Sequence, residues 1–332
     1  MVAGWSLARQ ASQVLVLSAP ADDVASDTAL VRSGVGGVLL TGAASPPSLG
    51  GALAALHAAG GRVPPLVAVD EEGGRVERLG GLIGSLASAR QQGASLSPQQ
   101  VEDGAAALGR RLKAVGVDVD FAPDADLDGG SALRPIGDRS FSADPERAAT
   151  YAGAFARGLE RGGVVPVIKH FPGHGSADGD TDLQAATTPP LDRLRSADLR
   201  PFATLVRAGV PAVMVGHLQV PGLTEPGRPA SISPAAIGLL RHDLGFGGVI
   251  MTDSLSMGAI SRAGLSVPQA VVQALEAGAD AVLFTSNGDA PPAVGAIGEA
   301  VTTGALAPAR LQEAVVRVLA LKHVDLCAPP GA

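Results

Sequence analysis

Eight short apolar runs recur along this chain, and each leads into a stretch with helical spacing. From the second run onward they start roughly 30 to 50 residues apart, which leaves room for a crossover helix and its loops. Most runs are apolar at nearly every position instead of alternating, as expected for strands covered on both faces of a parallel sheet. The runs are residues 14–18, 37–40, 66–69, 117–121, 165–169, 212–216, 249–252 and 281–284.

Helix-start signals lie between the runs, where the crossovers belong. Ser97-Pro98-Gln99-Gln100 offers an N-cap, a proline at the first helical position and a capping-box glutamine. Asp144-Pro145 and Ser233-Pro234 repeat the cap and the proline, and a last helix is predicted from Pro308. Strands that alternate with helices in this way are typical of α/β folds.

Eight such units within 332 residues predict one (β/α)8 barrel of the TIM type, a single domain over residues 1–332. The rival is a doubly wound open sheet, which usually carries a glycine-rich phosphate loop after an early strand. Residues 36–42 read Gly-Gly-Val-Leu-Leu-Thr-Gly and match neither that loop nor a Walker motif. We therefore expect the barrel.

Charge and composition exclude several partners. Lys and Arg number 25 against 32 Asp and Glu, so the chain has no excess of positive charge to attract nucleic acid. Aromatic residues make up only 3%, which leaves few rings for bases to stack on, and we expect no nucleic-acid partner. No stretch approaches the ~18 apolar residues of a membrane span. The first 20 residues make a poor signal peptide, which leaves the compartment open: cytoplasmic for the sequence as given, exported if a leader preceded it. We expect a monomer.

No cofactor or metal is expected. The single cysteine, Cys327, excludes an internal disulfide framework and a multi-cysteine metal site. His170 and His174 are spaced like a helical metal pair, but Pro172 and Gly173 between them forbid a regular helix.

Polar residues follow the ends of several runs, and a parallel barrel gathers these ends at one rim. The third run is followed by Asp70, the fifth ends in Lys169 and His170, and the sixth and seventh are followed by His217 and Asp253. Carboxylates, cations and imidazoles around one opening suit glycoside hydrolysis, which needs a carboxylate nucleophile and a second group as acid/base. The remaining polar groups would hold sugar hydroxyls by hydrogen bonds.

Each of these residues also has a purely structural interpretation. Asp253 would cap the helix after its strand, Asp70 would pair with a nearby arginine, and His217 would be a buried histidine with satisfied ring nitrogens. Lys169 would be a buried cation paired with a rim acid, or else the Schiff-base nucleophile of an aldolase. Their coincidence at one end of the barrel favours the catalytic interpretation.

The segment Lys169-His170-Phe171-Pro172-Gly173-His174-Gly175 strongly resembles a signature of bacterial β-N-acetylglucosaminidases of glycoside hydrolase family 3. The resemblance extends from about residue 10 to 322, and it implies a (β/α)8 barrel, in agreement with the strand count. Further matching segments follow the family's order at residues 70–78, 121–123, 138–141, 214–217 and 251–257.

The resemblance also implies roles for individual residues. Asp253 matches the nucleophile, which attacks the anomeric carbon and forms a glycosyl-enzyme intermediate. The implied activity is that of a retaining exo-β-N-acetylglucosaminidase that removes terminal sugars from cell-wall or chitin-derived saccharides. Positions that bind the terminal N-acetylglucosamine correspond to Asp70, Arg78, Arg139, Lys169 and His170, and the rim of the same pocket corresponds to Met214 and His217.

One loop departs from the family pattern. The family usually reads Asp-Ser-His there, with the histidine as a mobile acid/base and the aspartate orienting it. This chain reads Asp180-Thr181-Asp182, so Asp180 keeps the orienting position and Asp182 stands in place of the histidine. The match resumes at residues 188–191, which argues against a shifted alignment.

Three interpretations of this loop stay open. Asp182 is itself the acid/base, with Asp180 nearby to favour its protonated form. Alternatively the acid/base is lost, and the protein is a slow hydrolase or a saccharide-binding relative without turnover. As a third option, Glu71, Glu72 or His174 supplies the proton. Without the histidine, a β-glycosidase of another sugar specificity is also open.

Overall fold

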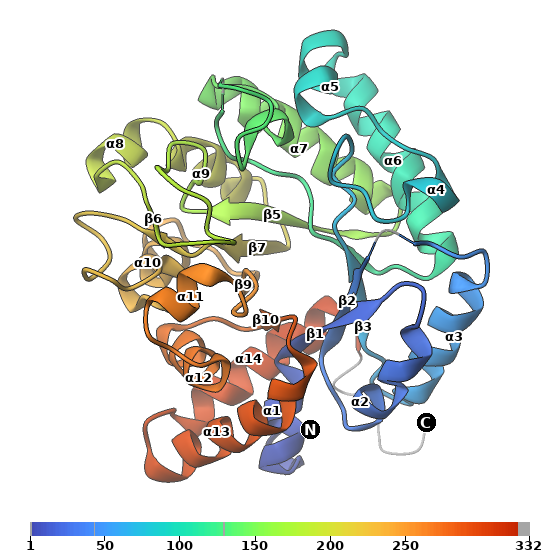
Figure 1. The fold of residues 1–332 in the computed structure, drawn as a ribbon, viewed down its shortest axis with the longest axis vertical. Helices are drawn as coiled ribbons and strands as arrows, with labels where there is room; N and C mark the ends of the chain where they lie inside the picture. Colours follow the sequence, from blue (N-terminus) through green and yellow to red (C-terminus); the bar gives the residue numbers. More distant parts are fainter. Residues whose placement is uncertain (1, 43, 129, 325–332) are drawn as a thin grey trace.

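The computed structural model describes residues 2–42, 44–128 and 130–324; Cys327 lies outside the described residues. All eight predicted runs form strands of one parallel sheet, and the neighbours follow the order β10-β1-β2-β3-β4-β5-β7-β9. A bridge between Met251 and Ala281 joins the two outer strands, so the sheet closes into the expected (β/α)8 barrel (Figure 1). The strands are β1 (Leu15–Pro20), β2 (Gly37–Thr41), β3 (Leu66–Val69), β4 (Val119–Asp120), β5 (Val165–Phe171), β7 (Ala212–Val215), β9 (Val249–Thr252) and β10 (Val282–Phe284).

Helices surround the strands on the outside of the barrel (Figure 1). Two short strands, β6 (Ala186–Thr187) and β8 (Leu218–Gln219), form a separate parallel pair within the loops. The α-helices are α1 (Leu7–Gln13), α2 (Thr28–Arg32), α3 (Leu49–Ala59), α4 (Gly80–Ile83), α5 (Ala89–Ser95), α6 (Pro98–Val115), α7 (Pro145–Arg161), α8 (Leu191–Ser196), α9 (Leu199–Arg207), α10 (Pro234–Gly238), α11 (Gly258–Arg262), α12 (Val267–Ala277), α13 (Ala290–Thr303) and α14 (Pro308–Leu321).

The predicted helix starts are confirmed. Ser97 Oγ accepts from the backbone N–H of Gln100 at 3.3 Å, and Gln100 Oε1 accepts from the N–H of Ser97 at 2.8 Å, which completes the capping box of α6. Asp144 Oδ1 accepts from Arg147 N at 2.8 Å at the start of α7, and the last helix begins at Pro308. Among the described residues, no helix is both long and apolar enough to cross a bilayer.

Apolar side chains fill the inside of the barrel. Leu66 and Val165, the first residues of β3 and β5, pack on this inner cluster together with Leu321 of α14, so α14 covers the end where the strands begin. The opposite end, where the strands finish, is left for polar side chains. The buried inner cluster comprises Val16, Leu39, Ala68, Val119, Phe121, Val167, Ala212, Met214, Val249, Met251, Ala281, Leu283 and Val318.

Candidate active site

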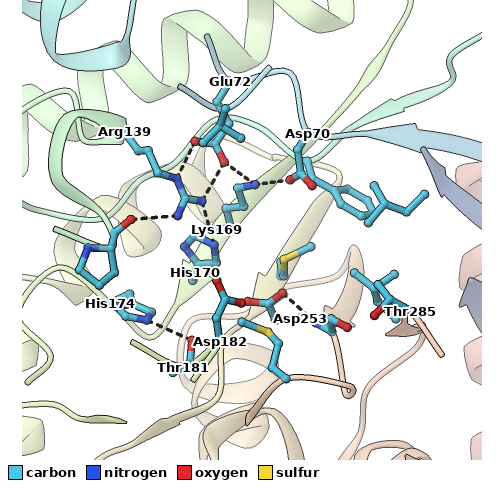
Figure 2. Close-up of a pocket in the computed structure, with 18 of the residues that line it drawn as sticks. Asp70, Glu72, Arg139, Lys169, His170, His174, Thr181, Asp182, Asp253 and Thr285 are labelled. Atoms are coloured by element: carbon cyan, nitrogen blue, oxygen red, sulfur yellow. Dashed lines mark hydrogen bonds and ion pairs between the residues drawn. The ribbon is translucent and has the colours of Figure 1, made fainter. Parts of the chain in front are cut away.

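A cavity of about 700 Å³ opens at the end of the barrel where the strands finish (Figure 2). Asp70 enters it directly after β3, Asp253 directly after β9, and Thr285 directly after β10. With the exception of His217, every residue predicted for the site lies on its wall: Asp70, Arg78, Arg139, Lys169, His170, Asp180, Asp182, Met214 and Asp253.

One wall is a network of paired charges that includes Glu72. Lys169 Nζ lies 2.6 Å from Asp70 Oδ1 and 2.6 Å from Glu72 Oε1. Nε and Nη2 of Arg139 each donate to a different oxygen of Glu72 at 2.8 Å, a bidentate pair. Burial would raise the pKa of Glu72, but Arg139 and Lys169 outweigh it and hold that pKa well below its usual range. Glu72 therefore remains ionised and fixes both cations.

The charges around Lys169 bear on its role. Burial alone would lower the pKa of its amine, but the carboxylates of Asp70 and Glu72 outweigh burial and raise that pKa. An ammonium that keeps its proton cannot attack a carbonyl, so this geometry disfavours Schiff-base chemistry. A fixed ammonium beside the carboxylate of Asp70 instead presents a donor and an acceptor to neighbouring hydroxyl groups, the pattern that binds a sugar.

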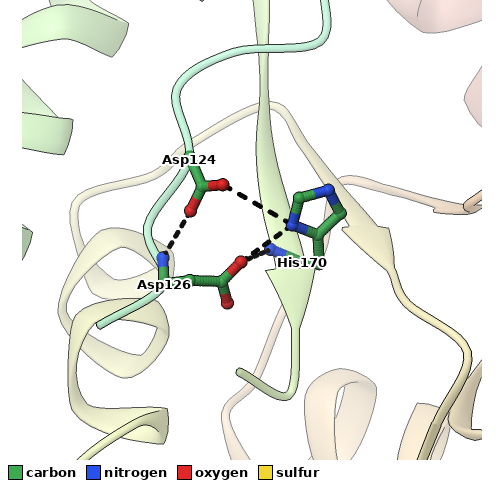
Figure 3. Close-up of side chains that lie close together, drawn as sticks. All are labelled: Asp124, Asp126 and His170. Carbon is green, nitrogen blue, oxygen red and sulfur yellow. Dashed lines mark hydrogen bonds and ion pairs between the residues drawn. The ribbon is translucent and has the colours of Figure 1, made fainter. Parts of the chain in front are cut away.

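Buried carboxylates behind the wall orient His170 (Figure 3). Nε2 of His170 lies 3.3 Å from Arg139 Nη2, which only donates, so the ring proton of neutral His170 is on Nδ1. Nδ1 then donates to Asp126 Oδ2 at 2.8 Å, and Asp124 Oδ1 accepts from the backbone N–H of Asp126 at 2.8 Å. Burial, followed by the charge of Arg139, lowers the pKa of His170.

Asp124, Asp126 and His170 are also candidate metal ligands. Among the described residues they form the one group of three or more His, Cys, Asp or Glu residues whose possible metal-binding atoms all lie within 4.8 Å of one another. The chain already uses most of these atoms, because Asp126 accepts from both His170 and the backbone N–H of His174 at 2.6 Å. Arg139 Nε lies 3.6 Å from Asp124 Oδ2, so a cation there would meet a positive charge. Burial raises the pKa of Asp126 to about 7, and the group is best described as the support of His170.

Asp253 follows β9, and its backbone is part of the barrel. Its N–H donates to Val215 O at 2.9 Å, and its Oδ1 accepts from the N–H of Ser254 at 2.7 Å. Burial raises the pKa of Asp253, but His170, His217 and the Ser254 N–H together outweigh it, so the pKa lies below its ordinary value. Asp253 is therefore an ionised carboxylate that faces the cavity.

His217 does not line the cavity but lies behind Asp253. Ser254 O accepts from Nε2 of His217 at 2.8 Å, and the hydroxyl of Ser231 is 2.7 Å from Nδ1, so both ring nitrogens are satisfied. The ring is fully buried and lies two residues after the end of β7. The structural interpretation of His217 holds, and its contact with Ser254 supports the segment that carries Asp253.

The loop after β5 brings Asp180 and Asp182 to the cavity, and Figure 2 shows Asp182 on the same side as Asp253. Asp180 Oδ1 accepts from the backbone N–H of Asp182 at 3.0 Å. Thr181 between them is buried, with its Oγ1 3.2 Å from Nε2 of His174. Asp182 is solvent-exposed, and partial desolvation at the cavity, followed by the charges of Asp253 and Asp180, raises its pKa. The two facing carboxyls thus have pKa values shifted in opposite directions.

The other proposed proton donors are engaged in fixed contacts, although Glu72 and His174 also line the cavity. Glu71 is buried away from the cavity and accepts from the backbone N–H groups of Arg78 and Leu79 at 2.8 and 2.9 Å. Glu72 is held ionised, as described above. Burial lowers the pKa of His174 to about 4, so this ring is neutral and contacts Thr181.

Sequence reasoning did not place Thr41, Thr285, Ser256 or Met257 on the cavity wall. Thr41 and Thr285 stand at the ends of β2 and β10, where the barrel model itself would have pointed to them. Ser256 and Met257 lie on the connection from β9 to α11, and their positions depend on how that connection folds.

The family model described as Glycosyl hydrolase family 3 N terminal domain matches residues 7–321. Beta-hexosaminidase LpqI of Mycobacterium tuberculosis is 45% identical over 296 residues, which are 87% of this chain and 76% of that protein. A beta-hexosaminidase of Stenotrophomonas maltophilia is 41% identical over 238 residues, 69% of each.

Solved structures are similar along nearly the whole chain. The structure of M. tuberculosis LpqI has a TM-score of 0.90 at 42% identity and covers 99% of this chain and 96% of that one. A glycoside hydrolase family 3 beta-N-acetylglucosaminidase from Paenibacillus sp. has a TM-score of 0.91 at 31% identity, covering 99% of this chain and 65% of that one.

Proposed function

The chain belongs to glycosyl hydrolase family 3 and is a glycoside hydrolase, and from this premise we propose that it is a retaining exo-β-N-acetylglucosaminidase with Asp253 as nucleophile and Asp182 as acid/base. The observation that carries the proposal is the pair of carboxyls on one cavity whose pKa values are shifted apart. Such a division separates an ionised nucleophile from a protonated acid at one pH.

In the first step Asp253 attacks the anomeric carbon while the bond from that carbon to the leaving oxygen breaks. The carboxyl proton of Asp182 passes to the leaving oxygen, so the aglycone departs as a neutral alcohol. The sugar remains attached to Asp253 as an ester. The lowered pKa of Asp253 and the raised pKa of Asp182 favour the two protonation states that this step needs.

The second step uses the same pair with roles reversed. Esterification removes the negative charge of Asp253, which is one cause of the raised pKa of Asp182. The pKa of Asp182 therefore falls in the intermediate, and its carboxylate accepts a proton from the water that attacks the anomeric carbon. The bond between the anomeric carbon and Asp253 breaks, which restores the carboxylate of Asp253, and the proton taken from the water leaves Asp182 protonated for the next cycle.

The charged wall fits a sugar that carries several hydroxyls. Asp70 and Lys169 present an acceptor beside a donor, and Arg139 and His170 lie next to them. Arg78 reaches the cavity as a further cation. The named relatives are beta-hexosaminidases, which supports β-linked N-acetylglucosamine at the end of a cell-wall or chitin-derived saccharide as the substrate.

Trapping the intermediate tests the proposal. The 5-fluoro analogue of N-acetylglucosaminyl fluoride should inactivate the enzyme and add the mass of one sugar to the peptide that contains Asp253. A label on another residue, or a β-glucosyl analogue that reacts faster, would contradict the nucleophile or the sugar.

A parallel assay with an aryl β-N-acetylglucosaminide separates turnover from binding. If the native chain binds N-acetylglucosamine but is silent, and Asp182→His is active, then the acid/base has been lost and the protein is a saccharide-binding relative.

A further inference from the structure

The loop that carries Asp182 is docked on the first turn of α11. The backbone N–H of Gly258 donates to Asp182 O at 2.9 Å, and the N–H of Ala259 donates to Thr181 O at 3.1 Å. These N–H groups belong to the first turn of a helix, where no carbonyl of the same helix can accept from them. Two backbone hydrogen bonds therefore join the loop to α11, one at Asp182 and one at the preceding residue, Thr181.

There is no space at Gly258 for a side chain. A Cβ built there would lie 2.5 Å from Leu183 O, 2.6 Å from Leu183 C and 2.8 Å from Asp182 O. These neighbours are backbone atoms of the loop and cannot rotate aside as a flexible side chain would. Any larger residue at position 258 must therefore move the loop away from α11.

The start of α11 is itself fixed relative to Asp253. Between them, the N–H of Leu255 donates to Leu283 O at 2.7 Å, and Ser256 Oγ accepts from the N–H of Thr285 at 3.0 Å. Both partners belong to β10 or follow it directly, so the connection from β9 to α11 is tied to the barrel. A loop seated on Gly258 consequently has a defined distance to Asp253.

We propose that Gly258 is a positioning residue for the acid/base, on the premise of the function proposed above. Its missing side chain lets the loop close on α11, and the closed loop sets the separation between Asp182 and Asp253. Retaining glycosidases hold their two carboxyl groups only about 5–5.5 Å apart. A shift of the loop lengthens this distance and takes Asp182 beyond hydrogen-bond reach of the leaving oxygen, while Asp253 and the sugar-binding wall stay in place.

The test is the kinetic signature of Gly258→Ala on two aryl β-N-acetylglucosaminides. A phenyl leaving group needs a proton, whereas a 2,4-dinitrophenolate leaves without one. We expect kcat/KM, which reports formation of the glycosyl-enzyme, to fall about 10–100-fold for the phenyl substrate and to stay within about threefold for the dinitrophenyl substrate. Gly295→Ala is the matched control, because position 295 lies within a helix and has open space around it.

Combining the variant with Asp182→Asn sharpens the test. If Gly258 acts through Asp182, Gly258→Ala should change the rate little once the acid is gone. Thermal unfolding of each variant reports folding. If Gly258→Ala does not fold, Ala259→Pro replaces it: proline is tolerated in the first turn and removes the N–H that donates to Thr181 O, and the same signature is expected.

Failure of this inference differs from failure of the proposed function. If Asp182→Asn shows the dependence on leaving group and Gly258→Ala behaves like the native enzyme, only the role of Gly258 is overturned. Equal losses on both aryl substrates in a folded Gly258→Ala also overturn it, because they indicate damage to Asp253 or to the sugar wall. If Asp182→Asn shows no dependence on the leaving group, Asp182 is not the acid, and both proposals fall.

Discussion

The two facing carboxyls are held by different kinds of structure. Asp253 directly follows a barrel strand, and its own N–H is hydrogen-bonded to the neighbouring strand. Asp182 lies in a loop beyond β5 and is held by loop contacts, through Thr181 and the first turn of α11. A strand end is fixed by the whole sheet, whereas a docked loop depends on a few hydrogen bonds. The position of Asp253, the proposed nucleophile, should therefore tolerate changes elsewhere in the chain, and the position of Asp182, the proposed acid/base, should be sensitive to them.

The largest expected effect comes from the fixed carboxyl. Asp253→Asn removes the attacking group, and kcat/KM for an aryl β-N-acetylglucosaminide should fall by about 10⁴-fold or more, with the melting temperature nearly unchanged. Steady-state rates and mass spectrometry after the 5-fluoro inactivator measure both consequences. A variant that still hydrolyses the substrate or still takes up the label would show that Asp253 is not the nucleophile.

The second-largest effect is expected at Asp182, the carboxyl carried by the loop. Asp182→Asn should lower kcat/KM by about 10²–10⁴-fold for a phenyl leaving group and much less for 2,4-dinitrophenyl. Azide, which needs no general base, should accelerate the variant with the activated substrate. If the rates with the two leaving groups fall equally, Asp182 acts on the sugar or on Asp253 instead of on the leaving oxygen, and the comparison fails.

The opposite pKa shifts predict the pH profile. The proposed mechanism requires Asp253 without its proton and Asp182 with it, so kcat/KM should fall below the lowered pKa of Asp253 and again above the raised pKa of Asp182. On the alkaline side the loss should approach tenfold per pH unit. Asp182→Asn should remove this alkaline limb and leave the acid limb. An unchanged alkaline limb would assign it to another group.

The smallest effect concerns a single loop contact. Thr181→Val keeps the size of the buried side chain but removes the oxygen that contacts His174. A lost hydrogen bond of this kind is worth about 1 kcal/mol, which corresponds to a fall of about fivefold in kcat for the phenyl substrate. Thr181→Ser retains the hydroxyl and should stay close to the native rate. Equal behaviour of the two variants would show that the contact does not hold the loop.

Much of the barrel could be predicted because its signals are local. The run at 249–252 matches β9 at both ends, and Ser97 with Gln100 forms the predicted capping box. Asp70 and Asp253 come together because both directly follow strands, and strand ends in a parallel barrel meet at one rim.

What escaped prediction depends on the path of the chain after each strand. His217 follows β7 closely, but the turn of the chain buries its ring behind Asp253. Asp126 lies in an irregular segment without periodicity, so nothing in the sequence marks its contact with His170. The docking at Gly258 joins a loop to the start of α11, two segments far apart in sequence, and such contacts leave no local pattern.

The apolar cluster inside the barrel has a consequence for how substrate and product move. Val318 and Leu321 of α14 pack with the inner apolar cluster, so apolar side chains fill the barrel between the cavity and the end where the strands begin. A polysaccharide chain therefore cannot pass through the barrel from end to end. The released sugar must leave the cavity on the side from which the substrate entered before the next substrate binds.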